Sequence, residues 1–159
     1  MATVITKPQA TSRWLGGGMF EHRMEGSVSY KSDAPMDGKT MADLEGPKPM
    51  EMLLGALAGC TGVDVVSMLE KMRVKLTDLR ICMTFRQAET PPKIYEHIHV
   101  DYYVESETPD LRKVVRAVRL SANKYCSVSA MLAGKVKLTY AVHHGGEIAE
   151  GVMHEEDQH

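Results

Sequence analysis

Residues 50–72 carry apolar side chains on nearly every side of the helix that their spacing predicts, rather than along a single stripe. A helix that is apolar all round is normally buried on all sides. Pro49 predicts that this helix begins at about residue 49, because proline is tolerated in the first turn. A chain of 159 residues has little else with which to surround so long a helix. The sequence therefore predicts a central helix over about 49–72 in a homodimer, whose partner subunit supplies part of the cover.

The segments around this helix predict strands and one further helix. Residues 1–46 are short polar stretches separated by glycines, which is typical of antiparallel strands joined by turns. Apolar and polar residues alternate over about 79–105, where the two strands of a hairpin are expected. Helical spacing of apolar residues then predicts a second helix over about 109–133.

The C-terminal part completes the pattern. Alternation returns at 135–142 and predicts a last strand, whereas residues 147–159 have the composition of a polar C-terminal tail. The order strands, helix, strands, helix, strand favours an α+β fold with sheets packed on helices. We expect a single domain over residues 1–146.

Charge and composition narrow the classes of partner. The chain has 19 basic and 21 acidic residues, so no broad basic surface is available for phosphates and nucleic acid is not an expected partner. The N-terminus lacks the charged start and apolar run of a secretory signal. Polar residues interrupt each apolar stretch before the roughly 20 residues that span a bilayer. We therefore expect a cytoplasmic protein without a membrane anchor.

Three cysteines, Cys60, Cys82 and Cys126, lie at wide spacings, which does not indicate a disulfide scaffold of the secreted kind. The chain has no Cys-x-x-Cys pair, and its seven histidines do not follow zinc-site spacings, so we expect no metal. Cys82 falls on the polar face of a predicted strand. A partly exposed cysteine without a role is the simplest interpretation of that position.

Cys60 lies among residues too small to shield its sulfur, within the sequence LAGCTG at 57–62. If the glycines break the helix there, the second half begins beside Cys60, and a helix N-terminus favours a nucleophilic thiolate. Asp64, four residues later and on about the same face, opposes that charge. The alternative interpretation is a buried structural cysteine, because a free cysteine behaves as a small apolar residue.

Cys126 lies near the end of the second predicted helix, on one helical face with Arg119 and Asn123. Arg119 has two possible roles beside the cysteines, either to stabilise a thiolate or to pair with Asp64. The simpler interpretation makes it part of a solvated basic stripe with its neighbours Arg112, Lys113 and Arg116.

Four segments together resemble the OsmC/Ohr family of osmotically inducible and organic hydroperoxide resistance proteins: GPKPMEMLL at 46–54, AGCT at 58–61, DVV at 64–66 and SANKYCSV at 121–128. The resemblance covers about residues 19–142 and is nearest the OsmC-like branch. It implies an intertwined homodimer in which antiparallel sheets from both chains wrap around two central helices.

The resemblance also implies a chemistry for the two cysteines. In the family, the cysteine that matches Cys60 attacks a hydroperoxide as a thiolate, releases an alcohol and becomes a sulfenic acid. The cysteine that matches Cys126 condenses with it to a disulfide, which a dithiol reductant of the lipoyl type reduces by exchange. The resemblance implies no metal, haem or flavin cofactor.

One part of the family pattern differs in this sequence. In the peroxidases, a glutamate near the start of the first helix pairs with an arginine from the N-terminal strands. The nearest glutamate is Glu51, one position closer to Cys60 than in that pattern, where this chain has Met50. One helical position turns a side chain by about 100°, so Glu51 is interpreted either as a catalytic residue or as a helix cap. Arg13 and Arg23 are the candidates for the arginine.

Two functions of different classes therefore remain. The first is a peroxidase for organic hydroperoxides that uses Cys60 and Cys126, with Glu51 as a further catalytic residue. The second is a non-catalytic dimer of the same fold that binds a small hydrophobic ligand or senses the redox state.

Overall fold

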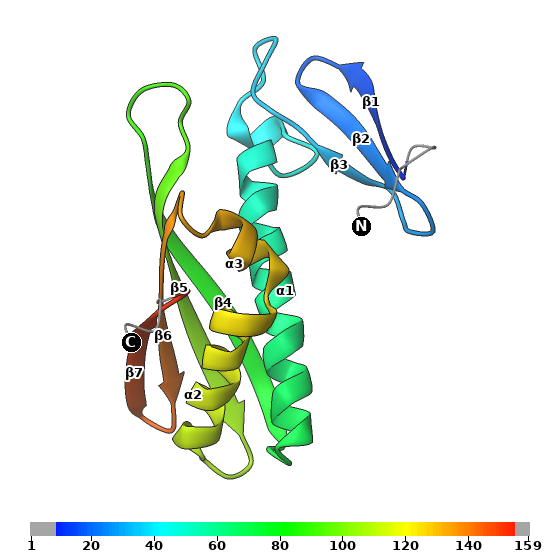
Figure 1. Cartoon of the computed structure of the whole chain (residues 1–159). Coiled ribbons are helices and arrows are strands. Elements are labelled where there is room, and N and C mark those ends of the chain that lie inside the picture. The colour runs from blue at the N-terminus through cyan, green and yellow to red at the C-terminus, as the bar shows by residue number, and fades with distance from the viewer. Residues whose placement is uncertain (1–8, 155–159) are drawn as a thin grey trace, which may run out of the picture. The chain divides into compact units, whose positions relative to one another are not determined.

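The computed structural model describes residues 9–154. It contains two compact units, one ending at Gly55 and the other beginning at Ala56, so the boundary falls inside the long helix α1 (Pro49–Lys71) (Figure 1). Helix α1 confirms the predicted central helix. The proposed break at its glycines is wrong, because α1 is continuous. A helical glycine costs only about 1 kcal/mol relative to alanine, which the packing of a long helix outweighs. The single domain over 1–146 stays a prediction.

The first unit contains a three-stranded antiparallel sheet. Its strands are β1 (Ala10–Gly16), β2 (Met19–Met24) and β3 (Tyr30–Ser32), paired in that order. The short 3₁₀ helix η1 (Met41–Asp43) follows before α1. The predicted strands and turns of the N-terminal part are thus confirmed, apart from residues 1–8, which lie outside the described residues.

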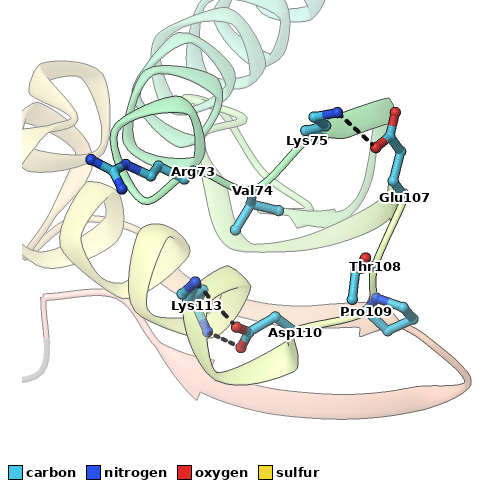
Figure 2. Close-up of a pocket in the computed structure, with 8 residues that line it drawn as sticks. All are labelled: Arg73, Val74, Lys75, Glu107, Thr108, Pro109, Asp110 and Lys113. Carbon is cyan, nitrogen blue, oxygen red and sulfur yellow. Dashed lines mark hydrogen bonds and ion pairs between the residues drawn. The ribbon is translucent and has the colours of Figure 1, made fainter.

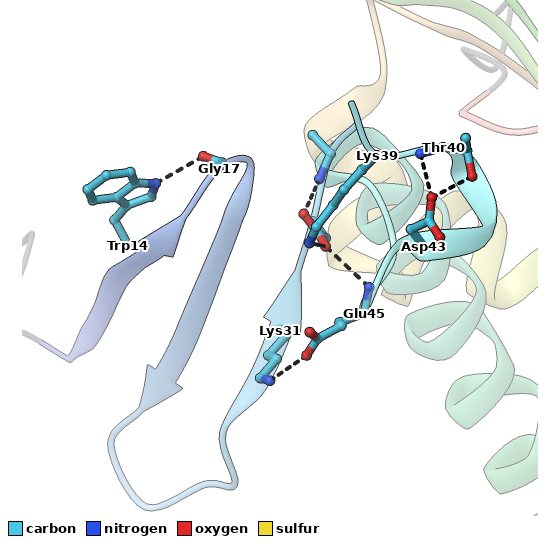
Figure 3. Close-up of polar contacts among 9 residues, drawn as sticks. Trp14, Gly17, Lys31, Lys39, Thr40, Asp43 and Glu45 are labelled. Atoms are coloured by element: carbon cyan, nitrogen blue, oxygen red, sulfur yellow. Dashed lines mark hydrogen bonds and ion pairs between the residues drawn. The ribbon is translucent and has the colours of Figure 1, made fainter. Parts of the chain in front are cut away.

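Asp33 organises the connection between β3 and α1. Its side chain is fully buried and accepts hydrogen bonds from Lys39 Nζ at 3.0 Å, the Glu45 N–H at 3.2 Å and the Ala34 N–H at 2.8 Å. Burial by itself raises the pKa of Asp33, but these donors outweigh it and hold that pKa below its ordinary value. Figure 3 shows the ion pair between Lys31 and Glu45 beside this connection.

The second unit is built on a four-stranded sheet in the order β4-β5-β6-β7. Strands β4 (Leu76–Gln87) and β5 (Tyr95–Ser106) form the predicted hairpin. Strand β6 (Lys137–His144) pairs with β5 in parallel, because the helices between them carry the chain back across the sheet. All other strand pairs are antiparallel. The last strand, β7 (Glu147–Val152), pairs with β6.

Helix α2 (Leu111–Leu120) and the part of α1 from Ala56 onward lie on the same face of this sheet (Figure 1). The strands β5 and β6 contribute to the core the buried residues Ile98, Val100, Tyr102, Val104, Leu138, Tyr140 and Val142. From α1 only one stripe is buried, at four-residue spacing: Leu57, Thr61, Val65 and Leu69. The other apolar residues of α1 are half-buried or exposed in the single chain.

Two predicted elements need correction. The second helix, expected over 109–133, is three pieces: α2, a π-helical turn η2 (Ser121–Tyr125) and α3 (Ser127–Leu132). The polar tail predicted over 147–159 is wrong for residues 147–152, which form β7, because hydrogen bonds to β6 stabilise a strand even with polar residues. Residues 155–159 lie outside the described residues.

Among residues 9–154, α1 is long and apolar enough to cross a membrane by length and composition. Polar residues interrupt α1 as expected, but they are too few to bring its mean hydropathy below that of a membrane span. The central helix of a soluble protein passes the same test, so the absence of a membrane anchor stays a prediction.

Candidate active site

The structure brings together the two cysteines that the sequence singles out. Cys60 lies in the middle of α1 and is half-buried, whereas Cys126 is the N-cap residue of α3 and is 1% exposed. Their side chains lie close enough together for Cys60 to raise the pKa of Cys126. Cys82 lies in β4, on the strand pair with Asp101, and is half-buried.

The thiol of Cys126 is held by the first turn of α3. Its sulfur accepts a hydrogen bond from the Ser129 N–H at 3.4 Å, and the Ser129 hydroxyl donates to the Cys126 carbonyl at 3.0 Å. Burial raises the pKa of Cys126, the contacts with Ser129 lower it, and the neighbouring Cys60 raises it further. The net shift is upward, so Cys126 is a protonated thiol at neutral pH.

A chain of buried hydroxyl groups lies beside the cysteines, and we call its four members, Tyr102, Thr61, Ser121 and Asp64, the hydroxyl chain. Tyr102 Oη lies 2.8 Å from Thr61 Oγ1, and Thr61 Oγ1 lies 2.9 Å from Ser121 Oγ. Ser121 Oγ donates to Asp64 Oδ2 at 2.9 Å. Tyr102, Thr61 and Ser121 are each at most 1% exposed.

The residues of the hydroxyl chain were missed as site residues in the sequence. Thr61 carried one usable signal, because it is the polar member of the four-residue spacing Leu57, Thr61, Val65 that marks the buried stripe of α1. Asp64 was noticed only as a charge near Cys60. No ion pair joins it to Arg119 in the part of the chain that the structure describes, and it accepts a hydrogen bond from Ser121 instead.

Glu51, the third residue predicted for the site, has a capping role. Its carboxylate accepts a hydrogen bond from the Lys48 N–H at 2.9 Å and pairs with Lys48 Nζ at 3.1 Å. These bonds to Lys48 hold the pKa of Glu51 below its ordinary value. The helix-cap interpretation of Glu51 is thus confirmed, and its catalytic role stays a prediction. Arg23 donates through Nε to the Ser29 hydroxyl at 3.3 Å.

A cavity of about 430 Å³ lies between α1 and the helical segment that precedes Cys126. Asp64 and Tyr125 belong to its walls, and the other lining residues are mostly apolar: Val63, Ser67, Met68, Lys71, Met72 and Leu120. Neither cysteine lines it. The cavity therefore offers apolar surface near the cysteine pair but no direct path to either sulfur.

Another cavity, of about 380 Å³, lies where α1 ends and α2 begins (Figure 2). Its charged residues pair with each other, Lys75 with Glu107 at 3.2 Å and Lys113 with Asp110 at 3.5 Å. No residue predicted for the active site lines this cavity. We therefore assign it no part in the chemistry of the cysteines.

Fold and site together define an α+β protein in which two free cysteines from different helices meet beside a buried hydroxyl network. A family model described as OsmC-like protein matches residues 40–141. Protein YhfA of Escherichia coli (strain K12) is 37% identical over 133 residues, which make up 84% of this chain and 95% of that protein. The chain belongs to the OsmC-like family.

Solved structures agree with this assignment at the level of the fold. An OsmC-like protein from Mycoplasma pneumoniae superposes with a TM-score of 0.72 at 16% identity, covering 87% of this chain and 98% of that one. The organic hydroperoxide resistance protein OhrB of Bacillus subtilis superposes with a TM-score of 0.56 at 18% identity, covering 84% and 96%. The expected α+β fold is confirmed, and its strand pairs are antiparallel except for the parallel pair of β5 and β6.

Proposed function

We propose that this protein is a thiol-dependent peroxidase that reduces organic hydroperoxides to alcohols. The observation that carries the proposal is the proximity of Cys60 and Cys126, which lie far apart in the sequence but close enough in the fold for Cys60 to raise the pKa of Cys126. Membership of the OsmC-like family supports a redox role, and a protein of similar fold is named for organic hydroperoxide resistance.

The proposed reaction has two steps at the cysteines. The Cys60 thiolate attacks the hydroperoxide, the O–O bond breaks, and the departing alkoxide takes up a proton, leaving an alcohol and a Cys60 sulfenic acid. The Cys126 thiol then condenses with this sulfenic acid to a disulfide, and water leaves. A raised pKa suits Cys126 to this order of events, because it keeps its proton while Cys60 reacts.

The cycle closes when a dithiol reductant, of the lipoyl type or another thiol, exchanges with the Cys60–Cys126 disulfide and is itself oxidised to a disulfide. No metal, haem or flavin takes part in these steps. Such a cycle starts from reduced thiols, which fits the cytoplasm. We expect Met50, Met52 and Leu53 to favour bulky organic peroxides over hydrogen peroxide, and Glu51 to assist catalysis.

We also propose that the working form is a homodimer. Val63 and Val66 in α1 are 71% and 43% exposed. They border a groove of about 600 Å³ between α1 and β4, whose other walls include Ala58, Gly59, Gly62, Leu79 and Ile81. Burying this apolar surface against a second copy is favourable by about 25 cal/mol per Å², and the small residues allow the close approach of another helix.

The peroxidase is tested by substituting Cys60→Ser and following the consumption of cumene hydroperoxide by the pre-reduced protein in stopped flow. We expect turnover to be abolished, since serine forms no reactive anion at neutral pH. Cys82→Ser is the matched control and should turn over as the unmodified protein does. Mass spectrometry of the oxidised protein should locate a Cys60–Cys126 disulfide. Unchanged peroxide consumption by Cys60→Ser would sink the proposal.

One observation favours the second candidate function, a dimer that binds a small hydrophobic ligand. Glu51 is bound to Lys48 at the helix N-terminus, as a structural cap is, so a peroxide-activating glutamate would have to break that pairing. The same stopped-flow experiment distinguishes the peroxidase from the ligand-binding dimer. An unmodified protein that consumes no hydroperoxide and keeps both thiols reduced would favour ligand binding.

A further inference from the structure

The hydroxyl chain has a single direction, which the acceptor at its end determines. A carboxylate only accepts, so the one hydrogen of the Ser121 hydroxyl goes to Asp64. Thr61 must then donate its hydrogen to Ser121, and Tyr102 must donate to Thr61. The pKa of Tyr102 is raised, chiefly by burial, in agreement with a phenol that keeps its hydrogen. Every hydroxyl in the chain therefore donates its one hydrogen within the chain.

Ser121 connects this chain to the cysteine of α3. Its backbone carbonyl accepts a hydrogen bond from the Cys126 N–H at 2.9 Å, which closes the π-helical turn η2. Its side chain meanwhile bonds to Thr61 and Asp64, both on α1. Thr61 directly follows Cys60 in the sequence. The segment that ends in Cys126 is thus tied to α1 at the residue beside Cys60.

We propose that Thr61 and Ser121 are positioning residues that hold the thiol of Cys126 opposite Cys60 and so favour their disulfide. Neither residue reacts, because each acts through the placement of a sulfur. The inference rests on the proposed peroxidase for its physiological meaning. In the peroxidase cycle, this positioning raises the rate at which Cys126 reacts with the Cys60 sulfenic acid, a reaction that competes with further oxidation to sulfinic acid.

The positioning is measurable without peroxide. In a glutathione redox buffer, the two protein thiols and oxidised glutathione exchange to give the protein disulfide and two reduced glutathiones, so electrons and protons balance. The equilibrium constant of this exchange reports how well one sulfur is presented to the other. It is obtained by alkylating the free thiols at a series of glutathione ratios and counting them by mass spectrometry.

Thr61→Val removes the hydroxyl at nearly constant volume. We expect the exchange constant to fall roughly tenfold, as befits the loss of buried hydrogen bonds. Thr139→Val is the matched control, because the Thr139 hydroxyl also bridges two side chains, His97 Nε2 at 2.8 Å and His99 Nδ1 at 2.7 Å, but has no link to the cysteines. It should leave the constant unchanged. Thr61→Ser, which keeps the hydroxyl, should restore most of the constant.

Ser121→Ala provides a second, independent break in the hydroxyl chain, should Thr61→Val fail to fold. It should lower the exchange constant by a similar factor. An equal constant for the folded chain-breaking variants and the unmodified protein would overturn the inference. So would an equal loss in Thr139→Val, or the absence of any Cys60–Cys126 disulfide in the unmodified protein.

A peroxide experiment separates this inference from the proposed function. With excess cumene hydroperoxide, Thr61→Val should accumulate several-fold more Cys60 sulfinic acid than the unmodified protein, while the first oxidation of Cys60 keeps its rate. If no variant consumes peroxide but the exchange constants change as expected, the peroxidase fails and the positioning role stands. If peroxide is consumed and the sulfinic acid yield is the same in Thr61→Val, the positioning role fails and the peroxidase stands.

Discussion

Cys126 meets almost no solvent, so the reactivity of its thiol depends on the few groups around it. Burial and the neighbouring Cys60 raise its pKa, and only the contacts with Ser129 act in the other direction. Cys60 is more exposed. Two identical side chains thus differ in their exposure to solvent. This difference matches the separate roles of an attacking and a resolving thiol.

The raised pKa of Cys126 predicts how disulfide formation depends on pH. Only the thiolate attacks efficiently, and its fraction keeps growing until the pH passes a pKa that lies above the ordinary value of 9.0. The rate of disulfide formation from the Cys60 sulfenic acid should therefore rise with pH and not level off below pH 9.0. Rapid quenching with an alkylating reagent at successive pH values measures this rate.

Ser129→Ala is the companion variant for the same measurement. The Ser129 hydroxyl lowers the pKa of Cys126, so its removal should move the whole rate profile to higher pH. A profile that levels off near neutrality in the unmodified protein would contradict the raised pKa.

The residues of the site were partly predictable. Cys60 and Cys126 stood out by their resemblance to a family, and the structure brings them together as that resemblance implied. Thr61 and Ser121 did not stand out in the sequence, because a buried hydroxyl can be assigned a role only when its hydrogen-bond partners are known. Those partners come from distant segments, at separations where the sequence carries no periodic signal.

Helices and strands with a strong periodicity of apolar residues were predicted well, and those with a weak periodicity were not. Helix α1 and the hairpin of β4 and β5 lie close to their predicted ranges. Strand β7 was missed because four of its residues are exposed and its apolar and polar residues do not alternate. The π-helical turn η2 was missed as well, because the backbone bond from Cys126 to Ser121 that closes it has no signature in composition.

Strand β7 depends on one close approach to its neighbour. Gly151 lies opposite Tyr140 of β6, and a Cβ atom at this position would clash with the Tyr140 ring. Gly151→Ala should therefore lower the free energy of unfolding by about 1–3 kcal/mol, the usual cost of overpacking. Urea unfolding followed by circular dichroism measures the change.

Gly55→Ala is the control for this prediction, since no heavy atom lies within 4 Å of the added Cβ and alanine favours a helix. It should leave the stability of the chain unchanged or raise it. An equal stability of Gly151→Ala and the unmodified protein would mean that β7 moves away from Tyr140 at no cost.

For the whole molecule, the main question is what covers α1. The sequence predicted a helix buried on every side, whereas a single chain buries only the stripe of Leu57, Thr61, Val65 and Leu69. The pattern that led to the prediction is real, because apolar residues do occupy nearly every side of α1. The difference is explained if the remaining faces of α1 are buried only in the proposed homodimer, by the partner subunit.

Val63→Glu tests that assembly. The substitution introduces a charge on the exposed apolar face of α1, and burying an unpaired carboxylate in an interface costs several kcal/mol. We expect the variant to sediment as a monomer where the unmodified protein sediments as a dimer. Ile148→Glu is the control, since Ile148 is similarly exposed at 63% but lies on β7, away from α1. A dimer in both variants, or a monomer in the unmodified protein, would contradict the proposed interface.

The π-helical turn before Cys126 also sets a limit on how the gene for this protein can change. A π turn contains one residue more than an α turn. Loss of a single codon within 121–125 would shorten the spacing between Ser121 and Cys126, so the π turn that the Cys126 N–H closes on the Ser121 carbonyl could not form in the same register. Substitutions in this stretch leave the count intact, but a deletion does not. The proposed site therefore depends on the length of the segment between Ser121 and Cys126 as well as on the two cysteines.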